Sequence, residues 1–84
     1  MTTVILRIRG VKVATGLSTA SVYRLMNEGL LPRPVHIGIK SVGWPEYEIE
    51  AINNARIAGA DNVEIRELVS LLVAARSERR GKSV

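Results

Sequence analysis

Residues 15–28, which read TGLSTASVYRLMNE, decide the fold of this chain. Gly16 suits the left-handed position that follows the end of a helix, and Ser18 suits the N-cap that begins the next one. The two signals predict a short helix over residues 10–15 and a second over residues 19–28, joined by a tight turn. A helix-turn-helix of this kind projects its second helix from the globule, where it can enter the major groove of DNA.

The second helix has two different faces. Val22, Leu25 and Met26 recur at helical spacing and predict a buried side. The opposite side carries Ala20, Tyr23, Arg24 and Asn27. At its beginning, the hydroxyl groups of Ser18, Thr19 and Ser21 can donate to phosphates or base edges, and Arg24 can reach a phosphate or a guanine. The predicted DNA contacts in this segment are Ser18, Thr19, Ala20, Ser21, Tyr23, Arg24 and Asn27. Tyr23 could equally pack half-buried against the first helix. The alternative for the whole unit is a pair of core helices with no special role.

A β-hairpin is predicted directly after this unit. Pro32 and Pro34 exclude a helix there, and short alternating segments at 35–37 and 41–44 flank a glycine-containing loop. This hairpin forms the wing of a winged helix, with DNA contacts predicted at Arg33, His36, Lys40 and Ser41. The alternative is a solvated hairpin that only covers the core. His36 has no second histidine or any cysteine to complete a metal site, so we expect neither a metal nor another cofactor.

A third helix is predicted from Pro45, at its first position, to about Ala58. Ile49, Ile52 and the stem of Arg56 form its expected inward face. Three glutamates in its first two turns suit the positive end of the helix dipole, and no nucleophile or metal ligand accompanies them in a catalytic motif. These residues are Glu46, Glu48 and Glu50. We therefore expect no enzymatic activity.

A fourth helix is predicted to open at the capping box Asp61–Glu64 and to run to about Arg80. Its apolar stripe, widened by Leu71 and Val73, predicts self-association through Ile65, Leu68, Val69 and Leu72. The alternative is that the helix folds back on the core. A membrane-surface helix is less favoured because Trp and Phe anchors are absent from it. The predicted organisation is a winged helix-turn-helix domain over 1–59, a C-terminal contact helix over 60–80 and a disordered tail over 81–84.

Charge is distributed unevenly along the 84 residues, whose formal net charge is +4. Residues 1–44 hold six basic residues and one acidic residue, a net charge of +5. Residues 45–84 hold six basic residues and seven acidic residues, a net charge of −1. A basic first half is typical of a surface that binds a polyanion, although it could also serve solubility alone. The chain has no cysteine, which excludes disulfides, and no segment suited to span a membrane or to act as a secretion signal. We expect a soluble protein of the bacterial or phage-infected cytoplasm, associated with the nucleoid.

The chain resembles the AlpA family of small prophage DNA-binding regulators, which are related to MerR-like winged helices and phage excisionases. The resemblance covers about residues 5–58 and rests on the segments Leu6–Ile8, Ala14–Ser18, Val22–Met26, Glu28–Gly29, Pro32, Pro34–Val35, Gly38 and Val42–Trp44. It implies a mainly α fold with a small β-hairpin wing and a DNA-binding winged helix-turn-helix. By position, Thr19, Ala20 and Ser21 match the start of the recognition helix, Arg24 its middle, and Lys40 and Ser41 the wing.

Three functions remain open at this point. The leading hypothesis is an excisionase, or recombination directionality factor, that binds repeated sites on double-stranded DNA, bends it and directs an integrase to excision. The second is a transcriptional regulator that acts at a promoter. The third is an adaptor whose basic face binds an acidic protein and not DNA.

Overall fold

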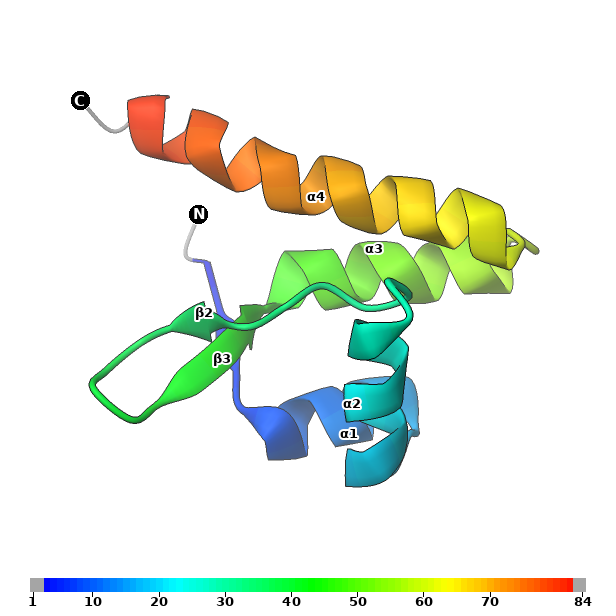
Figure 1. Cartoon of the computed structure of the whole chain (residues 1–84), viewed down its shortest axis with the longest axis horizontal. Helices are drawn as coiled ribbons and strands as arrows, with labels where there is room; N and C mark the ends of the chain where they lie inside the picture. The colour runs from blue at the N-terminus through cyan, green and yellow to red at the C-terminus, as the bar shows by residue number, and fades with distance from the viewer. Residues whose placement is uncertain (1–2, 83–84) are drawn as a thin grey trace.

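The computed structural model describes the backbone of residues 3–82 and the side chains of residues 3–78. Within these residues the elements are β1 (Ile5–Leu6), α1 (Ile8–Thr15), α2 (Thr19–Asn27), β2 (Val35–His36), β3 (Val42–Pro45), α3 (Glu46–Ile57) and α4 (Asn62–Lys82). Helices α1 and α2 lie on one side of α3, α4 lies along the other side, and the β2–β3 hairpin extends away from the helices (Figure 1). The predicted fold class, a mainly helical winged helix-turn-helix with an additional C-terminal helix, is confirmed.

The turn between α1 and α2 forms through the predicted signals. Gly16 has a positive φ of 74°, and its amide donates to the carbonyl of Lys12 at 2.8 Å. The amide of Ser21 donates to the Ser18 hydroxyl at 3.2 Å, which caps α2. Helix α1, however, begins at Ile8 and not at residue 10, and of its residues Val11 is the buried one.

The sheet has a third strand that sequence patterning did not pair. The order is β1-β3-β2 with both pairings antiparallel, and Leu6 lies opposite Trp44 in the central strand β3. Pro45 corrects a second expectation, because it ends β3 and caps α3 with a ψ of 127°, which is not helical. The amide of Glu46 then donates to the carbonyl of Val4 at 2.8 Å, which ties the start of α3 to the N-terminal strand.

Gly43 allows β1 to approach β3 closely. A Cβ atom at this position would lie 2.5 Å from Ile5 Cγ2 and 3.0 Å from the carbonyl oxygen of Leu6. Gly43→Ala is therefore expected to lower the free energy of unfolding by about 1–3 kcal/mol, measured by urea denaturation. The matched control is Gly38→Ala in the wing loop, where the added Cβ would make ordinary contact with Ser41 at 3.6 Å. Equal losses in the two variants would contradict a tight β1–β3 approach.

The core lies between α3, the helix-turn-helix and α4. Its central side chain is Trp44, which is fully buried and donates from Nε1 to the carbonyl of Pro32 at 2.9 Å. The buried apolar residues around it are Val11, Val22, Leu30, Leu31, Ile49, Ile52, Ile65 and Val69. Arg56, expected to lend its stem to the inward face of α3, is exposed.

Helix α4 belongs to this core, which corrects two of the four predicted self-association residues. Ile65 is fully buried and Val69 is 8% exposed, while Leu68 and Leu72 are partly buried against the same cluster. The apolar residues of α4 do recur at helical spacing, but most of them face α3 and the core. The alternative that the helix folds back on the core therefore accounts for Ile65 and Val69, and they are not available to a second chain. Division of the chain at residue 59 stays a prediction.

The ends of α4 are also defined. Asp61 and Glu64 form the predicted capping box, in which the Glu64 amide donates to Asp61 Oδ1 at 2.9 Å and the Asp61 amide to Glu64 Oε1 at 3.3 Å. The helix continues to Lys82, two residues beyond its expected end, so residues 81–82 do not belong to a disordered tail. Residues 83–84 lie outside the described part.

Glu48 lies in the first turn of α3, as predicted, but it also has a partner that the sequence did not indicate. Its side chain is fully buried and forms an ion pair with Arg76 of α4. Arg76 Nε donates to Glu48 Oε2 at 2.9 Å and Arg76 Nη2 to Glu48 Oε1 at 2.5 Å. Such a two-pronged contact between a guanidinium and a carboxylate satisfies both groups away from water. Glu46 and Glu50, in contrast, are exposed.

Candidate nucleic-acid interface

The outward face of α2 is open to solvent. The predicted contacts Thr19, Ala20, Tyr23, Arg24 and Asn27 are all exposed, and Ser21 is half-buried. Tyr23 is 46% exposed, so its ring lies at the surface of the helix-turn-helix and not in the core. Val22 is fully buried on the other side, where Leu25 and Met26 pack partly buried against the core. The structure thus brings the predicted α2 residues together on one accessible face.

The hydroxyl groups at the start of α2 are already engaged with each other. Ser18 Oγ donates to Ser21 Oγ at 3.0 Å and accepts the Ser21 amide. Because the Ser18 hydrogen is used within the cap, Ser21 is the better placed of the two serines to donate to a phosphate. The free amides of the first helical turn add a partial positive charge at this end.

The wing places its cation near its tip. Strands β2 and β3 pair with His36 opposite Val42, and the amide of Ile37 closes the loop by donating to the Ser41 carbonyl at 2.9 Å. Lys40 is exposed beside Ile39, which is 99% exposed, while Ser41 is half-buried. Arg33 and His36, at the base of the hairpin, are exposed as well. The wing residues are therefore accessible, at a distance along the molecule from α2 (Figure 1).

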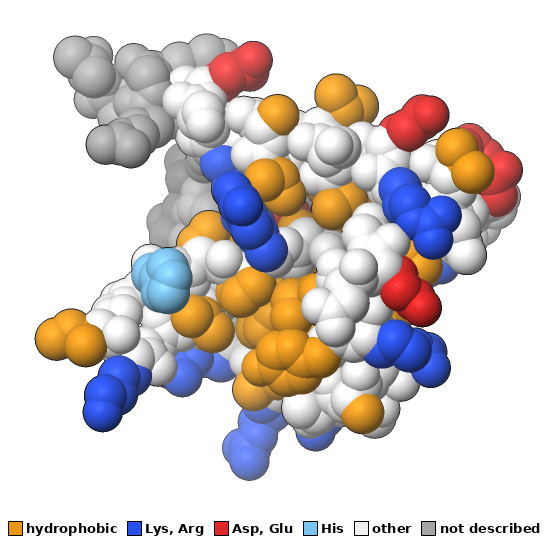
Figure 2. Space-filling view, in the orientation of Figure 1, with side chains coloured by type: hydrophobic (Ala, Val, Ile, Leu, Met, Phe, Trp, Pro, Cys, Tyr) orange, Lys and Arg blue, Asp and Glu red, His pale blue; other side chains and the backbone are white. Residues whose placement is uncertain are grey.

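Positive charge gathers on the same part of the molecule. Figure 2 shows Lys and Arg side chains over the wing and the lower part of the visible face, with others at its centre and over α4, whereas most of the visible acidic side chains lie over α4. The wing belongs to residues 1–44, whose net charge is +5.

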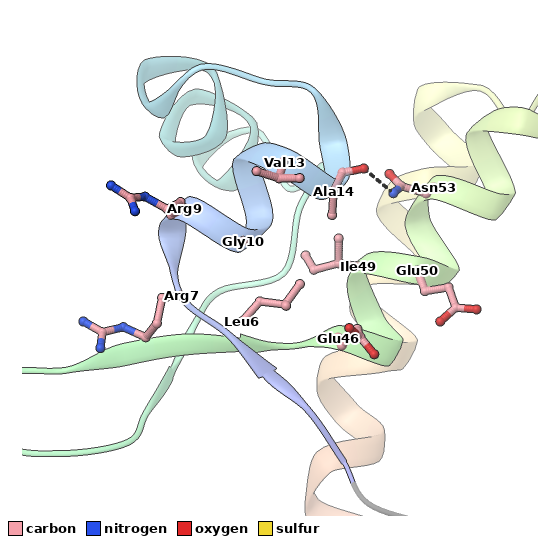
Figure 3. A pocket seen from close by; sticks show the side chains of 10 residues that line it. All are labelled: Leu6, Arg7, Arg9, Gly10, Val13, Ala14, Glu46, Ile49, Glu50 and Asn53. Atoms are coloured by element: carbon pink, nitrogen blue, oxygen red, sulfur yellow. Dashed lines mark hydrogen bonds between the residues drawn. The ribbon is translucent and has the colours of Figure 1, made fainter.

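Two cations that the site prediction omitted lie at the start of α1. Arg7 and Arg9 are exposed, and their guanidinium groups point away from Glu46 and Glu50, on the side from which β3 extends toward the wing (Figure 3). In the sequence, these two arginines are visible only as part of the positive charge of residues 1–44. Their position makes them further candidates for phosphate contacts.

A groove of about 750 Å³ lies between β1, α1 and the beginning of α3. Its lining includes the apolar side chains of Leu6, Val13 and Ile49, and Asn53 Nδ2 donates to the Ala14 carbonyl at 2.9 Å beside it (Figure 3). Among residues 3–82, no three histidine, cysteine or acidic side chains gather as they would around a metal ion.

Comparison with known proteins agrees with this geometry. The family model for the prophage CP4-57 regulatory protein (AlpA) matches residues 4–57, from just before β1 to the end of α3. A relative from Enterobacteria phage P4, uncharacterized protein ORF88, is 39% identical over 54 residues, which are 64% of this chain and 61% of that protein. The chain thus spans less than two thirds of the length of this relative.

No solved structure matches the chain, and along residues 3–82 no helix is long and apolar enough to cross a membrane. The family model includes both α2 and the wing, the two elements on which the candidate interface is built. The chain belongs to the AlpA family of prophage regulatory proteins.

Proposed function

We propose that this protein binds double-stranded DNA, with the outward face of α2 in the major groove and the wing along the adjacent backbone or minor groove. The observation that carries the proposal is the accessible face of α2, centred on Arg24, together with an exposed wing that ends in Lys40. A helix with a cation at its centre and hydroxyl and amide groups around it suits contacts to base edges and phosphates. Arg7, Arg9, Arg33 and His36 extend the contact to the backbone.

We further propose that the protein acts as an excisionase of a mobile element in the cytoplasm, at the nucleoid. The face of α2 holds few cations, so one copy has a limited electrostatic contribution to its affinity. Several copies on repeated sites would raise the affinity, bend the DNA between them and direct an integrase to excision. Contact between neighbouring copies through α4 is part of this proposal, with Leu71, 68% exposed, as an accessible large apolar residue of this helix.

A second candidate function is transcriptional regulation at a promoter. The description of the matching family as regulatory favours it, and the same interface would serve both roles. An excision assay with the element's integrase, run beside a promoter reporter, separates the two. A footprint confined to one isolated site, with no effect on excision, would exclude the excisionase.

Arg24→Ala and Lys40→Ala are expected to weaken DNA binding in different ways. Loss of Arg24 removes a contact to a base or phosphate and should cost about 1–3 kcal/mol of binding free energy, with relaxed specificity if the partner is a guanine. Loss of Lys40 should weaken binding to all sequences similarly and lower the slope of log affinity against log salt by about 1. Gel-shift titrations at several salt concentrations, on duplexes from the DNA that flanks the gene, measure both effects.

The charge-matched control is Arg56→Ala, which removes an exposed arginine from α3. It is expected to change binding less than either interface variant, since α3 is not part of the proposed DNA surface. Binding that is independent of salt, or that both interface variants leave unchanged, would contradict the proposal and favour an adaptor that binds an acidic protein.

A further inference from the structure

The segment between α2 and the wing, residues 28–34, is held through its main-chain carbonyl groups. Arg66 Nε donates to the carbonyl of Glu28 at 2.9 Å, at the end of α2. Arg76 Nη2 donates to the carbonyl of Arg33 at 2.8 Å, two residues before β2. Between these two residues in the chain, the carbonyl of Pro32 accepts a hydrogen bond from Trp44 Nε1. The segment between the two proposed DNA-contacting elements is thus fixed at Glu28 and, near its other end, at Pro32 and Arg33.

Both outer contacts come from α4, which lies beyond the family-matched residues 4–57. Arg66 and Arg76 are ten positions apart, about 15 Å along a helix at 1.5 Å per residue. They therefore reach opposite ends of the same segment. The aliphatic part of Arg66 also passes over Gly29, whose Cα faces Arg66 Cγ closely enough that an added Cβ would lie at 3.7 Å.

The Arg76 contact is itself held in place. Its guanidinium is fixed by two hydrogen bonds to the buried carboxylate of Glu48 on α3, and the neighbouring residues Leu30 and Leu31 are each 3% exposed. The Arg76 side chain is only 17% exposed, and its Nε and Nη2 groups are both engaged, so the guanidinium has little freedom to turn toward a phosphate. The arrangement links α3, α4 and the base of the wing in one hydrogen-bonded unit.

We propose that α4 is a brace that sets the position of the wing relative to α2, with Arg66 and Arg76 as positioning residues for DNA recognition. The inference rests on the proposed DNA binding. Two contacts on one ligand reinforce each other only when both sites are held at the spacing that the ligand presents. A segment already ordered before binding avoids the entropy loss of ordering it on the DNA. The brace therefore couples the contribution of Lys40 on the wing to the DNA-binding free energy with the contribution of Arg24 on α2.

The test uses two variants of the full chain. Arg66→Met keeps the aliphatic stem over Gly29 and removes the donor to Glu28. The double variant Glu48→Leu/Arg76→Leu removes the donor to Arg33 without leaving a buried charge unpaired, a replacement that buried ion pairs often tolerate. Arg56→Met is the control for loss of an exposed arginine. Thermal unfolding confirms that each variant is folded at the assay temperature.

The first measurement is hydrogen exchange of the free protein. The amide of Leu30 donates to the carbonyl of Leu25 at the end of α2. We expect it to exchange about tenfold faster in Arg66→Met, and the amides of Arg33 and of residues 35–37 to do so in the double variant. The amides inside α3 should change less. Unchanged exchange over residues 28–37 in both variants would overturn the brace.

The second measurement is a double-mutant cycle on duplex DNA from the region that flanks the gene. Lys40→Ala is expected to weaken the wild-type protein about fivefold, but the Glu48→Leu/Arg76→Leu protein less than about twofold, because an unbraced wing contributes little. If Lys40→Ala weakens binding by the same factor in both proteins, Arg76 acts independently of the wing. The inference is then wrong, while the proposed DNA binding stands. If the wild-type protein does not bind duplex DNA, both the proposed function and this inference fail.

Discussion

Arg76→Ala is expected to lower the free energy of unfolding by about 3–5 kcal/mol, because it leaves the fully buried carboxylate of Glu48 without its partner. The same change removes the donor to the Arg33 carbonyl at the base of the wing. Small domains of this size have stabilities of about 5–10 kcal/mol, so the loss is a large part of the total. Urea denaturation followed by circular dichroism measures it.

Two comparisons separate the orphaned charge from the loss of packing. Glu48→Leu/Arg76→Leu removes both partners and should be much less destabilising than Arg76→Ala, as replacements of buried ion pairs by apolar residues often are. Arg66→Ala removes an exposed arginine of the same helix with a single main-chain contact, and we expect about 1 kcal/mol. If Arg76→Ala were as stable as wild type, the carboxylate of Glu48 would have to reach water.

Trp44→Ala is expected to cost about 3–5 kcal/mol, as large-to-small changes at buried aromatic residues do. The indole is fully buried in the central strand and is surrounded by residues from the helices and from the segment before the wing. Its removal leaves a cavity and also deprives the Pro32 carbonyl of its hydrogen bond. The measurement is again the free energy of unfolding, with loss of near-ultraviolet dichroism as a sign of loosened packing.

Trp44→Phe divides this loss into its two causes. Phenylalanine keeps most of the apolar volume but has no N–H group, so the smaller cost expected, about 1–3 kcal/mol, reports the hydrogen bond and the remaining gap. Ile39→Ala, at the exposed tip of the wing, is the surface control and should stay within about 0.5 kcal/mol of wild type. A Trp44→Ala loss as small as that of Ile39→Ala would contradict the central place of the indole in the core.

The parts of the fold that sequence predicts are those encoded by neighbouring residues. The Ser18 cap, the left-handed Gly16 and the capping box at Asp61–Glu64 act within four positions of the chain, and all of them form. The hairpin likewise follows from residues on either side of one short loop. Local hydrogen bonds and backbone preferences are sufficient to identify such features.

The parts that sequence reasoning missed depend on distant partners. A glutamate in the first turn of a helix is well explained by the helix dipole, and nothing near Glu48 in the chain indicates that Arg76, 28 positions away, buries it. The direction in which Ile65 and Val69 face depends on where α4 packs, although their spacing was predicted. Strand β1 is two residues long and is recognisable only through its pairing with β3.

In the candidate interface, too, some features follow from neighbouring residues and others depend on distant ones. The exposed face of α2 follows from helical periodicity, since burial of Val22 determines which residues lie opposite. Arg7 and Arg9 could not be assigned, because their direction relative to the wing depends on the turn from β1 into α1. The contacts from α4 to residues 28–33 are invisible to patterning, since their acceptors are peptide groups and not side chains.

That choice of acceptor bears on how such a protein can change its target. A peptide carbonyl is present whatever amino acid occupies the position, so the contacts of Arg66 and Arg76 do not require a particular residue at 28 or 33. Side chains on the outward face of α2 and on the wing can be replaced while the frame that carries them stays intact. In the proposed DNA complex, substitutions at exposed positions of α2 and the wing would alter the target preference without removing the α4 contacts to the carbonyl groups of residues 28 and 33.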